Sequence, residues 1–122
     1  MTEIQKSKQY DLEDRTMRFS LTVREFVKTL PKSLQNFEDT KQLIRSSGSI
    51  GANYIEANEA ISKKDFILRI RISRKEAKET LYWLKLIDVG ESKSLASKRI
   101  ILVQEACELM NILSAIMRKV SP

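Results

Sequence analysis

The chain has 122 residues, of which 42% are hydrophobic and 31% are charged, a composition typical of a globular domain with a core. Histidine is absent and cysteine occurs once, which removes the commonest general base and metal ligand and excludes an internal disulfide scaffold. Three glycines and two prolines are too few for the turns of a β-sandwich. We therefore expect one domain over residues 1–122, with a short flexible N-terminus at about 1–9.

The N-terminal segment MTEIQKSKQYDLEDR has no apolar region of the kind that secretory signals carry. No run of apolar residues approaches the ~18 that a membrane span requires. The predicted location is therefore the cytoplasm.

The formal net charge of +6 is distributed unevenly along the chain. Residues 1–60 contain 9 basic and 9 acidic side chains, whereas residues 61–122 contain 13 basic and 7 acidic ones. Such asymmetry is typical of proteins with an anionic partner such as nucleic acid, although a solvated helix face produces the same pattern.

Two helical patterns fill the first half of the chain. The first begins after Tyr10 and ends before Pro31, because a helix interior does not tolerate proline. Spacings of four and three residues place its apolar residues on one face: Leu12, Thr16, Phe19, Val23, Phe26 and Leu30. The second pattern repeats these spacings after a short polar connection, at Leu43, Ser47, Ile50, Tyr54, Ala57 and Ile61.

The second pattern contains a segment of small residues, Ser46–Ala52, with two glycines in it. Each interior glycine costs about 1 kcal/mol of helix stability relative to alanine, yet the periodicity continues through the segment. We interpret it as a helix with a small-residue face. Gly48 and Gly51 lie on that face, where another helix or a neighbouring subunit can approach closely.

Two further helices fill the second half. Ser62 followed by Asp65 is similar to a capping box, so a third helix is expected to begin near Lys63 and to reach Val89, with Gly90 as its C-terminal cap. Its core face is expected at Phe66, Ile70, Ser73, Ala77, Leu81 and Leu84. A fourth helix follows Ser92 or Ser94, with its core face at Leu102, Ala106, Leu109, Leu113, Ile116 and Val120. The predicted fold is all-α, an antiparallel up-down-up-down four-helix bundle.

The third helix has a second apolar strip beside its core face. At about 100° per residue, four residues lie roughly 120–180° away from the centre of the core face. They are Leu68, Ile72, Trp83 and Leu86. A large exposed apolar strip indicates an oligomer interface, and the alternative is a wide core that buries both strips.

The same helix carries its cations within an arc of about 100°. This basic stripe consists of Lys64, Arg71, Arg74, Lys75, Lys78 and Lys85. A stripe of that length can follow a phosphate backbone and release counterions. Pairing with the neighbouring acids, for example Lys75 with Glu79, is the alternative. Tyr82 is the one aromatic ring at the edge of the arc.

Nothing in the sequence points to a catalytic, cofactor or metal site. Carboxylate-bridged metal bundles use Glu-x-x-His motifs, which this chain lacks. Asn53 and Glu56 are the best candidate polar pair, and we interpret them as part of a structural network in preference to a catalytic site. Its cation is expected to come from the third helix, from Arg69, Arg74 or Lys75. We expect no enzymatic activity.

Several segments resemble the 23S rRNA intervening-sequence protein family, small bacterial four-helix-bundle proteins. A Ser-x-Ser-Ile-x-x-Asn-x-x-Glu pattern is matched by Ser47, Ser49, Ile50, Asn53 and Glu56. Lys63–Phe66, Arg74–Glu79 and Trp83-Leu84 follow in the family's order, so that the resemblance covers about residues 10–120. Where many members have Glu-Gly, this chain continues Glu56-Ala57-Asn58-Glu59-Ala60, and we expect its second helix to extend closer to Ile61.

The resemblance implies a homopentameric bundle. It also implies RNA or DNA as a partner, because a related accessory protein of diversity-generating retroelements is a basic pentamer that binds nucleic acid. The leading hypothesis is therefore a homo-oligomer that binds nucleic acid through the basic stripe. The alternative is a scaffold that binds a protein partner without direct contact with nucleic acid.

Overall fold

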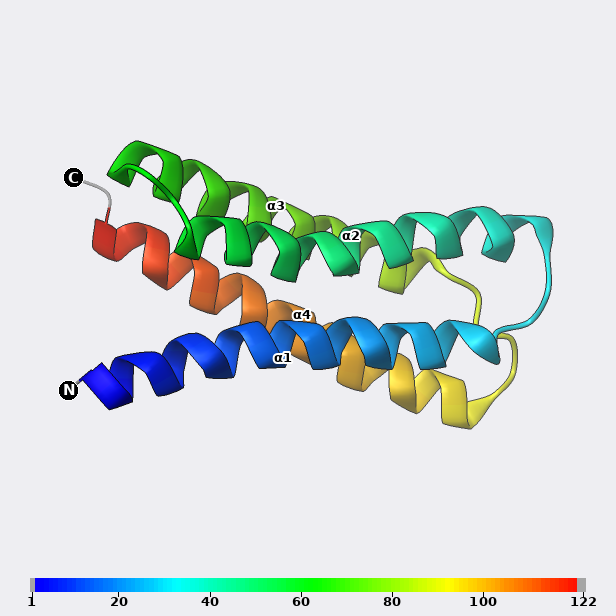
Figure 1. The fold of residues 1–122 in the computed structure, drawn as a ribbon. Coiled ribbons are helices and arrows are strands. Elements are labelled where there is room, and N and C mark those ends of the chain that lie inside the picture. The colour runs from blue at the N-terminus through cyan, green and yellow to red at the C-terminus, as the bar shows by residue number, and fades with distance from the viewer. Residues whose placement is uncertain (1, 121–122) are drawn as a thin grey trace.

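The computed structural model describes the backbone of residues 2–120 and the side chains of residues 12–120. Four helices follow one another: α1 (Thr2–Lys28), α2 (Leu34–Asn58), α3 (Lys63–Leu86) and α4 (Lys93–Val120). They run alternately in opposite directions, with the start of α1 and the end of α4 at the end of the bundle where α2 turns into α3 (Figure 1). Each helix packs against two neighbours, in the cyclic order α1, α2, α3, α4. This arrangement confirms the predicted antiparallel four-helix bundle.

The core follows the predicted heptad-like spacings closely. On α1, every predicted position from Leu12 to Leu30 is buried, including Thr16 at 1% exposure. The predicted α2 positions up to Ala57 are buried as well. Phe66 on α3 and Ile116 on α4 are only half-buried and pack against the edge of the core.

Small and hydroxyl-bearing residues bring α2 close to both of its neighbours. Thr80 Oγ1 donates to Ser46 Oγ at 2.9 Å, and Ser73 Oγ donates to the carbonyl of Ile50 at 2.7 Å, which joins α3 to α2. A Cβ at Gly51 would stand 2.7 Å from Thr16 Oγ1 of α1. The face at Gly51 is therefore filled by a helix of the same chain and is not available to a neighbouring subunit.

The ends of three helices differ from the sequence prediction. Helix α1 begins at Thr2, well before Tyr10, and so takes in most of the segment expected to be flexible; Met1 lies outside the described residues. Helix α2 ends at Asn58, which leaves Ile61 96% exposed in the connection. The expected extension towards Ile61 is wrong because the amide of Glu59 turns back to the carbonyl of Glu56 at 3.2 Å and tightens the last turn.

Helix α3 begins as predicted but ends three residues early. Ser62 Oγ accepts a hydrogen bond from the amide of Asp65 at 3.0 Å, which confirms the predicted N-cap. At the other end Ile87 has φ −60° and ψ 141°, an extended conformation that stops the helix before Val89. Gly90 has φ 65° and lies in the turn towards α4, so the prediction that it caps α3 directly is wrong.

A buried asparagine joins the two connections at the other end of the bundle. Asn36, 3% exposed, donates through Nδ2 to the carbonyls of Pro31 at 2.9 Å and Asp88 at 2.8 Å. Its Oδ1 accepts from the amide of Asp88 at 3.0 Å. The α1–α2 and α3–α4 connections are thereby held together through one side chain.

The two α2 glycines provide a matched test of the close approach between α1 and α2. Gly51→Ala is expected to lower the free energy of unfolding by about 1–2 kcal/mol. The added methyl group overlaps Thr16, and the energetic cost of this overlap exceeds the gain in helix propensity. Gly48→Ala is expected to raise it by up to ~1 kcal/mol, because nothing lies within 4 Å of the added Cβ. Urea unfolding measures both, and Thr16→Ala should restore stability to the Gly51 variant. Equal effects of the two alanines would contradict the tight contact.

Asn36→Ala is expected to destabilise the protein by about 2 kcal/mol, because it leaves backbone groups of both connections without partners. Thermal and urea unfolding measure the loss. The neighbouring Gln35→Ala serves as the control, since Gln35 is exposed. A loss no larger than that of the control would show that the two connections are held by other contacts.

Candidate nucleic-acid interface

The six cations of the predicted basic stripe lie along the outer face of α3. Arg74 is half-buried, and the other five are exposed. Among the side chains of residues 12–120, none of the six is within ion-pair distance of an acid. The stripe extends over about 30 Å of helix, and its positive charge faces solvent.

The acids beside the stripe are engaged by a cation from the adjacent helix. Arg45 of α2 forms two hydrogen bonds with Glu76, both at 3.3 Å, and a further one with Glu79. The hydrogen bond to Glu76 is the main cause of the raised pKa of the Arg45 guanidinium. The alternative pairing of Lys75 with Glu79 is therefore not observed, because Arg45 reaches both carboxylates from the facing helix.

The predicted apolar strip of α3 is partly exposed. Leu68 and Leu86 are each 51% exposed, while Ile72 and Trp83 are half-buried. Trp83 packs against the core and donates through Nε1 to Glu79 at 3.2 Å. The strip is thus only partly buried within the bundle, and about half of the surface of each of its two leucines is exposed.

One exposed aromatic ring lies near the edge of the basic stripe, on the side of the apolar strip. Tyr82 is 59% exposed, and its ring meets that of Trp83 edge to face, with the centroids 5.0 Å apart and the planes at 83°. The sequence shows Tyr82 at the edge of the arc, but it does not show that the neighbouring indole supports the ring.

The polar network predicted around Asn53 and Glu56 forms only in part. Asn53 Oδ1 accepts from Arg69 Nη1 at 3.5 Å, and its Nδ2 donates to the carbonyl of Ser49 at 2.9 Å. Glu56 is exposed and does not join this contact, because it lies on the outward side of α2, next to the exposed Ile55. The contact between Asn53 and Arg69 joins α2 to α3.

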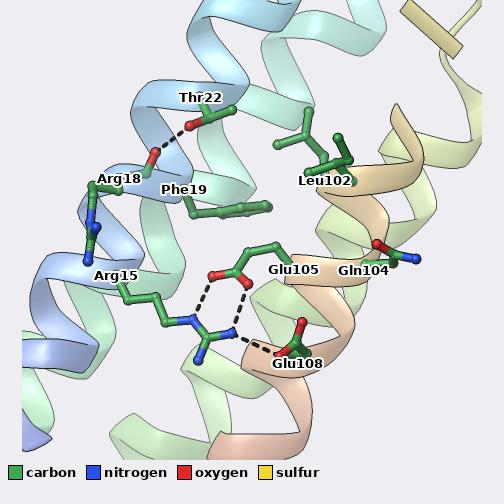
Figure 2. A pocket seen from close by; sticks show the side chains of 9 residues that line it. Arg15, Arg18, Phe19, Thr22, Leu102, Gln104, Glu105 and Glu108 are labelled. Carbon is green, nitrogen blue, oxygen red and sulfur yellow. Dashed lines mark hydrogen bonds and ion pairs between the residues drawn. The ribbon is translucent and has the colours of Figure 1, made fainter. Parts of the chain in front are cut away.

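The cleft between α1 and α4 contains an ion pair that sequence reasoning missed. Arg15 reaches across from α1 and donates to both oxygens of Glu105, at 2.7 and 2.8 Å, and to Glu108 at 3.2 Å (Figure 2). The hydrogen bond to Glu105 is the main cause of the raised pKa of Arg15. Phe19 and Leu102 line the same hollow, which has a volume of about 420 Å³. Both carboxylates already hold a cation, so the cleft is a structural contact.

The chemistry available elsewhere in the described residues is limited. Among them, no group of three or more histidine, cysteine, aspartate or glutamate side chains is placed to hold a metal ion. Burial raises the pKa of the Tyr54 hydroxyl, which lies in the core beside α1. These features indicate structural roles.

Helix α4 is more apolar than the sequence analysis recognised. An 18-residue window in it has a mean hydropathy of 1.6, which by length and composition is enough to cross a membrane. A core helix of a soluble protein meets the same criterion of length and composition. In this structure Leu102, Leu109 and Leu113 lie in the core, and Glu105 binds Arg15.

Comparison with known proteins identifies the class of helical bundle. The sequence model of the 23S rRNA-intervening sequence protein family matches residues 8–115, so the chain belongs to that family. A crystal structure of a protein of unknown function from the S23 ribosomal protein family of Bacteroides thetaiotaomicron is similar over 91% of this chain and 98% of its own. The two are 32% identical, with a TM-score of 0.76. No curated protein matches the chain significantly.

Proposed function

We propose that the protein is a non-enzymatic homo-oligomer that binds RNA or DNA through the basic stripe of α3. The observation that supports this proposal most directly is the separation of charge around α3. Five exposed cations and the half-buried Arg74 have no acidic partner among the described side chains, while Arg45 holds the adjacent Glu76 and Glu79. An unpaired stripe binds a polyanion by displacing its counterions.

The relation of the two acids to Arg45 strengthens this argument. Glu76 and Glu79 have side chains that are 15% and 34% exposed, and Arg45 neutralises charge that would otherwise repel phosphates. The stripe therefore presents a nearly uninterrupted positive field. Arg71, Lys75 and Lys78 form its centre.

The apolar strip supports assembly into oligomers. Leu68 and Leu86 lie at opposite ends of the exposed side of α3, and Ile72 and Trp83 lie between them in sequence. A row of this kind gains free energy when a second copy of the chain covers it. The subunit number of five rests on the family resemblance and stays a prediction, as does the cytoplasmic location.

Neutralising the centre of the stripe tests the nucleic-acid proposal. We expect the triple variant Arg71→Gln, Lys75→Gln and Lys78→Gln to bind single-stranded RNA with a weaker salt dependence. The magnitude of the negative slope of log affinity against log salt should fall by about 2. Fluorescence anisotropy over a series of salt concentrations measures the slope.

The matched control removes the same number of charges from other exposed positions, by Arg24→Gln, Lys32→Gln and Lys98→Gln. It should leave the slope nearly unchanged. Equal effects of the two triple variants would show that the stripe is not the binding site. Salt-insensitive or undetectable binding by the wild-type protein would instead favour the protein scaffold.

Charging the apolar strip tests assembly. Leu68→Glu with Leu86→Glu should convert the oligomer into a 14.1 kDa monomer with unchanged helix content, because both side chains are half exposed in the single chain. Light scattering and circular dichroism measure the two quantities.

Ile100→Glu with Ile101→Glu is the corresponding control on α4, where the two side chains are 59% and 62% exposed. If this pair dissociates the protein and the α3 pair does not, the interface lies on α4. A wild-type protein that is monomeric at micromolar concentration would contradict assembly altogether.

A further inference from the structure

We infer that Tyr82 is a base-stacking platform and that the ligand of the basic stripe is a single-stranded nucleic acid. This inference rests on the proposed function and specifies its substrate class. It follows from the juxtaposition of one exposed, supported aromatic ring with cations on both sides of it along the same helix.

Tyr82 lies within the stripe along the helix axis. Lys78 precedes it by four residues and Lys85 follows by three, so both lie on neighbouring turns of the same side of α3. Lys75 is a further turn away. With its ring 59% exposed, Tyr82 can present a face to a planar ligand while the cations contact phosphates before and after it.

A series of contacts holds the ring in place. The edge-to-face contact with Trp83 restricts the Tyr82 ring, and Trp83 is held by its hydrogen bond to Glu79. Glu79 is bound in turn by Arg45 of α2. A platform that is already ordered loses little side-chain entropy when a base stacks on it.

The chemistry of the face favours unpaired bases. In a duplex the bases stack on each other inside the helix, so an exposed tyrosine ring finds no free base face. A single strand offers such faces, and stacking accepts any base because every base has a π surface. Helix α3 contains neither asparagine nor glutamine, the side chains that typically read adenine edges, which also indicates binding with little sequence preference.

The test compares single-stranded RNA, single-stranded DNA and the corresponding duplexes of equal length, each measured by fluorescence anisotropy. Tyr82→Ala should weaken binding of the single strands about 5- to 150-fold, the range found when a base-stacking aromatic is removed. Duplex binding should change less than about twofold, since the cations remain. Tyr82→Phe should retain the wild-type affinity because it keeps the ring.

Phe37→Ala provides a matched control. Phe37 is another exposed ring, at 62%, but it lies on α2 under Lys41 and outside the stripe. Its removal should leave single-strand affinity unchanged. Circular dichroism of all three variants verifies that the helices are intact.

The chain offers a second readout in its single tryptophan, Trp83. Because this indole touches Tyr82, a base that stacks on the platform should change its fluorescence. The change should persist in Tyr82→Phe and disappear in Tyr82→Ala at concentrations that saturate binding.

The outcomes separate this inference from the proposed function. Salt-sensitive binding that Tyr82→Ala leaves unchanged, or a preference for duplexes, overturns the stacking platform and retains the stripe. Absence of binding to any nucleic acid overturns both. If Tyr82→Ala loses affinity for single-stranded RNA alone or for single-stranded DNA alone, the result supports the platform and identifies which nucleic acid it binds.

Discussion

The close approach of α2 to α1 and α3 is the constraint on which the other features depend. Glycine, serine and threonine at the two contacts keep side-chain volume small, and their hydroxyl groups bond across the helices, as Thr80 does with Ser46. The short distance allows Arg45 to reach Glu76 and Glu79 on α3. Arg45 in turn leaves the cations of the stripe without acidic partners and holds the glutamate that supports Trp83. Packing in the core thus determines the charge and the aromatic geometry of the outer face.

Periodicity predicted the core well because burial of one helix face is a local property of spacing. Two predicted helix ends were wrong: Ile61 continues the spacing beyond the end of α2, and no glycine or proline between Leu86 and Gly90 signals the end of α3. At the second of these, Asn36 and Arg99 bind backbone groups of Asp88 and Ile87, contacts that join segments far apart in sequence. Helix ends of this kind depend on tertiary partners that periodicity does not contain.

The candidate site, like the fold, could be predicted from the sequence only where it depends on spacing within one helix. The angular arrangement of the cations on α3 follows from their spacing alone, so the stripe was recognisable in the sequence. The partners of Glu76, Glu79 and Trp83 depend on which helix lies beside α3 and at what distance. For the same reason the ion pair of Arg15 with Glu105 gave no signal, since its members are separated by 90 residues. Glu56 shows the opposite error, because its spacing from Asn53 suggested a shared role that its outward direction does not allow.

In the proposed function, assembly and nucleic-acid binding make different demands on one helix, and α3 separates them by angle. The leucines of the apolar strip and the cations of the basic stripe occupy adjacent sectors, and Tyr82 lies near the edge of the cation sector that faces the strip. In the proposed oligomer, a second copy that covers the strip leaves the stripe in its adjacent sector free, and each added subunit brings another stripe to the same strand. Binding at one stripe then raises the effective concentration of the strand at the next, so weak contacts at each subunit combine into stable binding. An oligomer therefore needs neither a deep pocket nor readout of base edges to retain a single strand.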